Sequence, residues 1–190
     1  NEDKLTFSAV FKMNEQGEVL DEWFGRTVIH SARRFSYEEA QQIIETGEGD
    51  LKKEVLKLYE VSKILKEKRF KNGSVNFERE EVKFHLAEDG TPTGVYFKVQ
   101  KEANWLIEEF MLLANKRVAA FASRGGRYEK EVSPAEPKGK KQVGKTFVYR
   151  IHDVPDPEKM DSFTRFIGKF GHTLNPQQSG RRLSVALNNL

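Results

Sequence analysis

One uninterrupted stretch, residues 101–121, limits what this chain can fold into more than any other feature. It contains no Gly or Pro and is rich in strong helix formers, so it predicts one long helix. A helix turns by about 100° per residue, which places one apolar stripe toward a core and a second row beside it. The stripe comprises Ala103, Ile107, Phe110, Ala114, Val118 and Phe121, and the second row comprises Asn104, Glu108, Met111 and Asn115.

The second row contains two amides and a carboxylate. It is consistent with a polar site built into the helix, and equally with an ordinary boundary between core and surface. The same geometry predicts that Trp105, Glu109 and Lys116 point further round, toward solvent. Most carboxylates at such boundaries have no specific role, so the row is a candidate site that needs independent support.

Composition excludes several classes of protein. A chain of 190 residues that is 37% hydrophobic can bury one sizeable core, so one domain or a large part of one is expected. The absence of Cys excludes disulfides and thiolate ligands. No apolar run is long enough to span a bilayer and no signal-peptide pattern opens the chain, which predicts a soluble, cytoplasmic protein without a membrane partner.

The net charge is only +3, but residues 63–71 and 124–145 are locally basic. Such runs are compatible with a polyanionic partner, although solvated surface lysines are the commoner reason for them.

The first half of the chain predicts a hairpin and two helices. Alternation in residues 5–13, a turn at residues 14–17 and a return strand over residues 19–30 predict a half-buried β-hairpin. Ser36 and Glu39 fit a capping box for a helix that stops at Gly47. Asp50 is a plausible cap for a longer helix to about residue 69, with four residues inward: Leu51, Val55, Leu58 and Leu65.

The second half predicts another hairpin, a loop and more helices. Strands over residues 75–86 and 93–99 flank a turn, and the long helix follows them directly. Residues 123–146 are predicted to form a mobile basic loop, and residues 147–151 are predicted to form a short strand. Asp156 and Pro157 predict the start of a helix that ends at Gly171, with four residues facing inward: Met160, Phe163, Ile167 and Phe170. A last helix is predicted to contain Leu183, Ala186, Leu187 and Leu190.

These elements predict an α+β fold in which β-hairpins pack against long helices, because strands and helices do not alternate as in a doubly wound sheet. The sequence contains no P-loop, no glycine-rich dinucleotide turn and no nucleophile elbow. The four histidines, His30, His85, His152 and His172, lack metal-ligand spacing. On its own residues, the chain does not resemble a complete enzyme.

The order of five motifs resembles the middle of the RNB catalytic domain, the family of RNase R and RNase II. The motifs begin at residues 5 (Leu-Thr-Phe-Ser-Ala-Val-Phe), 34 (Arg-Phe-Ser-Tyr-Glu-Glu-Ala), 73 (Gly-Ser-Val-Asn-Phe-Glu-Arg-Glu-Glu), 103 (Ala-Asn-Trp-Leu-Ile-Glu-Glu-Phe-Met-Leu-Leu-Ala-Asn) and 149 (Tyr-Arg-Ile-His-Asp-Val-Pro). The similarity covers nearly the whole chain, so residues 1–190 are expected to be part of one RNB domain with a mobile basic loop at about 123–146.

The resemblance implies an activity and three site residues. Members of this family are processive 3′→5′ exoribonucleases that hydrolyse single-stranded RNA to mononucleotides with Mg²⁺. Tyr37 and Glu108 match a tyrosine and a helix glutamate that sense the ribose, and Phe77 matches an aromatic that stacks on the terminal base. A stacked base contributes about 1–3 kcal/mol without sequence preference, and only RNA offers a 2′-hydroxyl. Asn104 and Asn115 are weaker candidates beside Glu108.

Other parts of the family pattern are expected outside this sequence. The aspartates that hold the metal would precede Asn1, and a Ser-Pro-Ile-Arg stretch that holds the scissile phosphate would follow Leu190. The resemblance therefore implies a middle segment that contributes substrate-channel residues and no Mg²⁺ ligands, and that is inactive alone. A segment of this kind would expose apolar faces, through which two copies could associate. The alternatives are a catalytically inactive RNA-binding or protein-interaction module of the same fold, and a structural fragment without a ligand.

Overall fold

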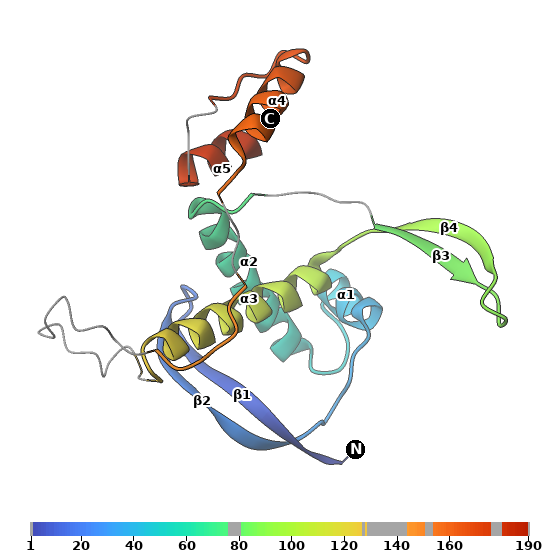
Figure 1. Cartoon of the computed structure of the whole chain (residues 1–190). Coiled ribbons are helices and arrows are strands. Elements are labelled where there is room, and N and C mark those ends of the chain that lie inside the picture. Colours follow the sequence, from blue (N-terminus) through green and yellow to red (C-terminus); the bar gives the residue numbers. More distant parts are fainter. Residues whose placement is uncertain are drawn as a thin grey trace, which may run out of the picture. The chain divides into compact units, whose positions relative to one another are not determined.

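The computed structural model describes residues 2–75, 81–126, 128, 144–150, 154–175 and 180–189. Figure 1 shows a mixture of helices and strands, which confirms the predicted α+β class. The elements follow in the order β1 (Asp3–Met13), β2 (Val19–His30), α1 (Tyr37–Thr46), α2 (Lys52–Lys71), β3 (Glu81–Leu86), β4 (Pro92–Lys98), α3 (Glu102–Ser123), α4 (Pro157–Gly168) and α5 (Gly180–Asn188).

The chain divides into two compact units. The first contains residues Asn1–Leu65 and Lys101–Arg150, and the second contains Lys66–Gln100 and Ile151–Leu190. Helix α2 contributes residues to both units. Most of the predicted mobile loop, residues 127 and 129–143, lies outside the described residues, and that prediction stays untested.

In the first unit, β1 and β2 form the predicted antiparallel hairpin. Gly17 closes its turn with φ +67°, where a side chain would be strained and would also approach Ile64 of α2 to 3.1 Å. The prediction that β1 is half-buried holds only near this turn. Phe11 and Met13 are partly covered, whereas Leu5 and Phe7, nearer the open end of the hairpin, are 88% and 84% exposed.

Helix α1 begins as predicted. The Ser36 hydroxyl accepts a hydrogen bond from the Glu39 N–H, and the Glu39 carboxylate accepts one from the Ser36 N–H. Gly47 ends the helix with φ +69°. These bonds and the guanidinium of Arg33 lower the pKa of Glu39.

The side chain of Gln41 joins α1 to α3. It is 6% exposed, its Oε1 accepts a hydrogen bond from the Ala103 N–H at 3.0 Å, and its Nε2 donates to Glu102 at 2.7 Å and to Glu45 at 2.9 Å. The first N–H groups of a helix have no partner within that helix. A side chain of α1 therefore satisfies one backbone donor at the start of α3, which sets how the two helices meet.

Helix α3 forms as predicted, but its buried side differs from the predicted one. Leu106 and Glu109 are 8% and 3% exposed, whereas Ile107 is 43% exposed and Glu108 is also exposed. The prediction that Glu109 points to solvent and Glu108 lies nearer the core was wrong. The apolar pattern runs more than halfway round the helix, so it allowed a range of orientations, and the polar contacts at its two ends decide between them.

At the end of α3, two arginines meet a carboxylate of the hairpin. Glu22 of β2 is only 5% exposed at its side chain, and its Oε2 accepts a 2.5 Å hydrogen bond from Arg117 Nε. Its Oε1 lies 3.6 Å from Arg124 Nη2, at the end of the helix, where a cation also faces the negative end of the dipole. This buried ion-pair cluster connects β2 to α3.

Some predicted inward positions of α2 are on the surface. Val55 is buried, but Leu51 and Leu58 are 42% and 45% exposed, and Ser62 is buried at 3%. Leu51 lies before the helix with φ +50°, so it cannot take its place on the helical stripe. Asp50, the predicted cap, lies 3.5 Å from Arg33 Nε.

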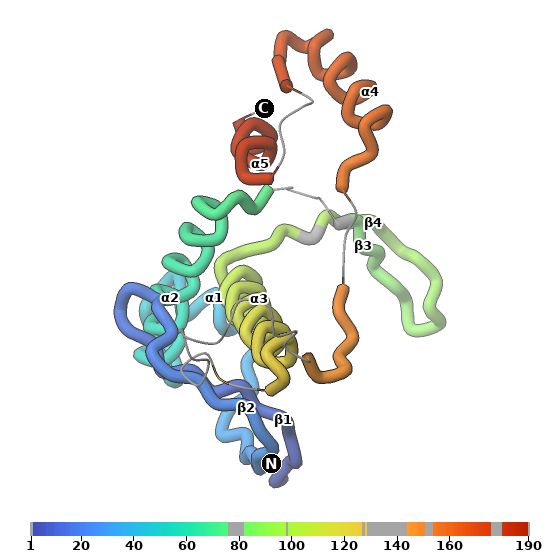
Figure 2. The backbone as a smooth tube through the Cα atoms, turned by 60° about the vertical axis from the view of Figure 1, so that its left-hand side comes forward, coloured from blue at the N-terminus to red at the C-terminus, as the bar shows by residue number. Residues whose placement is uncertain are grey.

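The predicted strand at residues 147–151 is not formed in its described part. Residues 147–150 have no regular secondary structure, and the described sheets are the pairs β1–β2 and β3–β4. A strand requires hydrogen bonds from a neighbouring strand, and a short apolar run does not reveal whether one is at hand. This segment belongs to the same unit as α3 and is drawn in orange in Figure 2.

In the second unit, α4 and α5 share a small core. Asp156 caps α4 by accepting hydrogen bonds from the Glu158 and Lys159 N–H groups. Ile167, Leu174 and Leu183 are buried, with Met160, Ala186 and Leu187 packed against them. Phe163 and Phe170, which were predicted to face inward, are 38% and 68% exposed.

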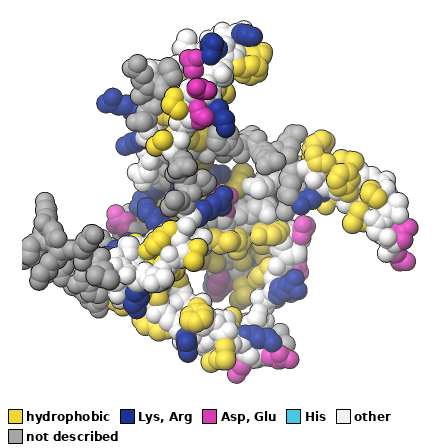
Figure 3. All heavy atoms as spheres, in the orientation of Figure 1, with side chains coloured by type: hydrophobic (Ala, Val, Ile, Leu, Met, Phe, Trp, Pro, Cys, Tyr) yellow, Lys and Arg dark blue, Asp and Glu magenta, His cyan; other side chains and the backbone are white. Residues whose placement is uncertain are grey.

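The predicted hairpin of β3 and β4 also forms in this unit, with Val82 opposite Phe97 and Phe84 opposite Val95. These four side chains are 48–59% exposed, and Figure 3 shows apolar surface along this hairpin.

Replacing Glu22 with Gln should lower the free energy of unfolding by about 3 kcal/mol, because it leaves two arginines beside a neutral, buried side chain. Chemical denaturation of the 190-residue chain measures this loss. Asp21→Asn removes the neighbouring exposed carboxylate and should cost less than about 1 kcal/mol. Equal losses from the two variants would contradict a specific role of Glu22.

The junction of α1 and α3 should weaken in acid. Hydrogen bonds from Gln41 and then from Lys101 lower the pKa of Glu45 below its usual 4.5. The stabilisation is therefore complete above the pKa of the unfolded chain, and it is lost as the pH falls through the lower, folded value. Unfolding at a series of pH values should show Glu45→Gln less stable than wild type near neutrality, with a difference that shrinks below about pH 4.

The matched variant Glu48→Gln removes an exposed carboxylate in the loop after α1. It should show no such pH-dependent difference from wild type. A constant difference for Glu45→Gln from pH 7 to pH 3 would contradict the assigned ion pair.

Candidate functional site

The structure places Tyr37 and Glu108 on two helices that pack together in the first unit. Tyr37 is the first residue of α1 and is 46% exposed, and Glu108 is exposed on α3. The hydrogen bonds of Gln41, one turn beyond Tyr37, connect these helices. Both predicted ribose contacts are therefore accessible on a joined pair of helices. Phe77, the predicted stacking residue, lies outside the described residues.

Asn104 and Asn115, the weaker candidates, have different surroundings. The Oδ1 of Asn104 accepts a hydrogen bond from the Lys101 N–H at 3.1 Å, so this amide helps to start α3. Asn115 is exposed and lies two turns beyond Glu108 on the same face of the helix. Asn104 has a structural role, and Asn115 is available to a ligand.

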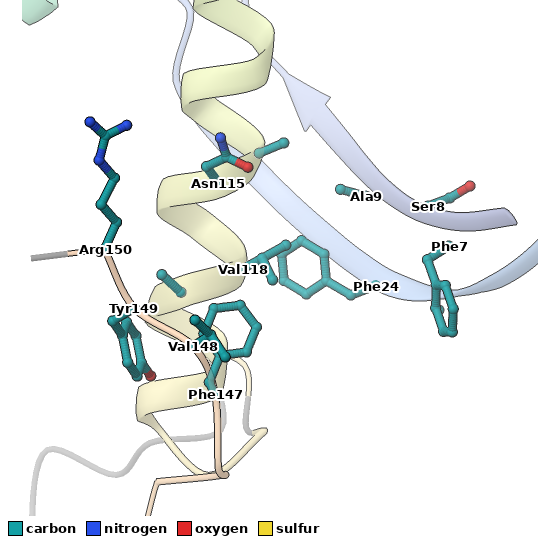
Figure 4. Close-up of a pocket in the computed structure, with 13 residues that line it drawn as sticks. Phe7, Ser8, Ala9, Phe24, Asn115, Val118, Phe147, Val148, Tyr149 and Arg150 are labelled. Carbon is teal, nitrogen blue, oxygen red and sulfur yellow. The ribbon is translucent and has the colours of Figure 1, made fainter.

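Asn115 lines a groove of about 920 Å³ within the first unit. The hairpin contributes Phe7, Ser8, Ala9, Phe24 and Gly25, α3 contributes Ala114, Asn115, Val118 and Ala119, and the remaining wall is residues 147–150. Figure 4 shows Asn115 and Val118 projecting from α3, Phe24 pointing toward Val118, and Arg150 extending away from Tyr149.

An aromatic cluster supports the end of this groove. The ring of Phe24 lies 5.1 Å from that of Phe121 and 6.0 Å from those of Phe11 and Tyr128. The backbone N–H of Phe24 donates a 3.2 Å hydrogen bond to the hydroxyl of Tyr128. Together with the ion pair of Glu22 and Arg117, this cluster fixes β2 against α3.

The groove combines side chains that suit a nucleotide. Phe7 is 84% exposed, and Phe147 and Tyr149 are 44% and 45% exposed with ring centroids 5.1 Å apart. Exposed aromatic faces can stack on bases, an arginine such as Arg150 can bind phosphate, and an amide can hydrogen-bond a base edge. Phe7, Phe147, Tyr149 and Arg150 were predicted to lie in strands, and none of them was predicted as a site residue.

The described residues do not fit a metal centre. No group of three or more His, Asp or Glu side chains among them could hold a metal ion. Within the same residues, no helix has both the length and the apolar character needed to cross a membrane.

Comparison with known proteins identifies the chain's relatives. DIS3-like exonuclease 2 of Caenorhabditis elegans is 40% identical over 134 residues, which are 62% of this chain and 16% of that protein. Inactive exonuclease DIS3L2 of Arabidopsis thaliana is 31% identical over 195 residues, with 94% of this chain and 17% of that protein covered. Ribonuclease R of Aquifex aeolicus is 29% identical over 179 residues, with 90% and 23% covered. The chain thus spans about a sixth to a quarter of the length of these relatives.

Solved structures share the fold. RNase R of Mycoplasma genitalium, in complex with ribose methylated single-stranded RNA, matches with a TM-score of 0.79 and 19% identity over 99% of this chain and 28% of that chain. The same enzyme in complex with double-stranded RNA also matches with a TM-score of 0.79, over 99% of this chain and 32% of that chain. A family model described as RNB domain matches residues 1–189, so the chain belongs to the RNB domain family.

Proposed function

We propose that this chain is part of a longer 3′→5′ exoribonuclease, to which it contributes part of the channel for single-stranded RNA. The whole enzyme would release mononucleotides processively. Family membership supports this proposal, together with relatives named as exonucleases and ribonucleases. The observation that carries it is the accessible surface of α3, where Glu108 and Asn115 share one face and Asn115 opens into an aromatic groove.

In this proposal, the chain's own residues bind and orient the RNA. The carboxylate of Glu108 accepts a hydrogen bond from a ribose 2′-hydroxyl, and the hydroxyl of Tyr37 donates to the same sugar or its neighbour. Aromatic side chains of the groove stack on bases without sequence preference, which suits an enzyme that advances along any strand.

Magnesium is part of the proposal for the whole enzyme, with its ligands outside this sequence. The described residues of this chain offer no cluster of carboxylates that fits the ion, and no chemical step is assigned to them.

The variants Tyr37→Ala and Glu108→Ala should each reduce the preference for RNA over DNA. One lost hydrogen bond to a 2′-hydroxyl corresponds to about 1.4 kcal/mol, so the dissociation constant for RNA should rise about tenfold, while that for DNA of the same sequence changes less than about twofold. Fluorescence anisotropy with labelled oligonucleotides on the 190-residue chain measures both constants.

Glu60→Ala is the control, because it removes an exposed carboxylate of α2 in the same unit. Glu109 is unsuitable as a control because it is buried. Equal effects of the three variants, or equal losses for RNA and DNA, would show that the polar row on α3 is only a boundary.

The isolated chain should not degrade single-stranded RNA when Mg²⁺ is added, because the proposed metal ligands lie elsewhere. Incubation of the purified chain with end-labelled RNA, resolved on a denaturing gel, tests this. Turnover that requires Mg²⁺ and disappears with EDTA would contradict the proposed location of the metal site.

A second candidate is a catalytically inactive RNA-binding or protein-interaction module. It is favoured by one relative, the inactive exonuclease DIS3L2 of Arabidopsis thaliana, which is 31% identical over 94% of this chain. The two candidates lead to different expectations for the residues encoded just before residue 1. An aspartate cluster encoded just upstream of residue 1 would favour the nuclease, and its replacement by other residues would favour the inactive module.

A further inference from the structure

The second unit gathers positive charge from two stretches that are far apart in the sequence. The end of α2 with the turn after it, residues 66–75, carries Lys66, Lys68, Arg69 and Lys71, and α5 carries Arg181 and Arg182. Within residues 66–75 and α5, these six cations are accompanied by one carboxylate, Glu67, whereas the whole chain has a net charge of only +3. We call these six side chains the α2–α5 basic patch.

The fold brings the two stretches into contact. A Cβ at Gly73 would lie 3.1 Å from the Cα of Arg181 and 3.3 Å from its Cβ, and the side chain of Asn188 donates a 2.8 Å hydrogen bond to the Ser74 carbonyl. Figures 1 and 2 both show α5 beside the end of α2. Lys71, Arg181 and Arg182 are exposed there, and no carboxylate among the described residues forms an ion pair with them.

Local helix stability explains only half of this patch. Cations in the last turn of α2 are favourable because they face the negative end of the helix dipole. Arg181 and Arg182 lie in the first turn of α5, where the dipole disfavours cations and acidic residues are usual, yet that turn has no acidic residue. Packing α5 on the end of α2 therefore brings like charges together at a cost that a bound anion would remove.

We infer that the α2–α5 basic patch binds the phosphate backbone of a nucleic-acid strand, as a second contact apart from Tyr37 and Glu108. The choice of a nucleic acid among polyanions rests on the proposed function. Phosphate contacts from Lys and Arg ignore the bases and the sugar, so this contact adds affinity equally for RNA and DNA. The affinity that this contact adds falls as the salt concentration rises, because binding releases counterions from the strand and added salt opposes that release.

The double variant Arg181→Gln/Arg182→Gln tests this inference by fluorescence anisotropy, with a single-stranded RNA and a DNA of the same sequence at several salt concentrations. Each phosphate contact on a single strand contributes about 0.7 to the slope of log affinity against log salt concentration. The variant should reduce that slope by about 1.4 for both strands, which is a loss of affinity of about 25-fold at 0.1 M salt that vanishes toward 1 M.

The control is Lys159→Gln/Lys169→Gln, which removes two exposed cations of α4 and its end in the same unit. It should change the slope by less than half as much. Lys71→Gln removes the cation at the last residue of α2 and leaves α5 unchanged. It should lower the slope by about 0.7, and this loss would show that the effect of the double variant does not come only from altered packing of α5. Circular dichroism should show unchanged helix content in each.

Three outcomes would overturn the inference: equal slopes for variant and control, a loss confined to RNA, or binding to polyglutamate without binding to either nucleic acid. Failure of this inference and failure of the proposed function remain distinguishable. If Tyr37→Ala and Glu108→Ala reduce the preference for RNA but the patch variants have no effect, the proposed function stands and this inference fails. If RNA and DNA bind equally and the binding depends on the patch, this inference stands and the proposed function fails.

Discussion

The contact of Glu22 with Arg117 and Arg124 is the interaction on which the arrangement of the first unit depends. It joins the middle of β2 to the end of α3, and Phe24 and Phe121 pack beside it. A two-stranded sheet has little stability alone, so the hairpin needs such an attachment. Because the groove lies between this hairpin, α3 and residues 147–150, the ion-pair cluster also positions the candidate site.

Local signals in the sequence were sufficient to predict most elements. The alternation in β1 and β2, the capping box of Ser36 and Glu39, and the proline after Asp156 each determine structure within a few residues. Most of the predictions that were wrong concern long-range contacts. The burial of Glu109, the exposure of Leu58 and the missing strand at residues 147–150 depend on which parts of the chain meet, and periodicity does not contain that information.

The candidate site was predictable only through the family resemblance. Helical geometry selected the row with Glu108 and Asn115, both of which are accessible, but it also placed Glu109 on the wrong side. It gave no reason to join that row to Tyr37, which a buried glutamine on α1 connects to α3. The aromatic groove could not be predicted from the sequence because its walls come from three separate segments. The basic patch could not be predicted for the same reason, since Arg181 and Gly73 meet only in the fold.

We propose that RNA lies along the exposed face of α3 and in the adjoining groove. Photo-crosslinking tests it most directly: single-stranded RNA containing 4-thiouridine is irradiated with the 190-residue chain, and the modified peptides are identified by mass spectrometry. We expect crosslinks in α1, in α3 between Asn104 and Asn115, or at residues 147–150. Crosslinks confined to the β3–β4 hairpin and α4, with none in the first unit, would contradict it.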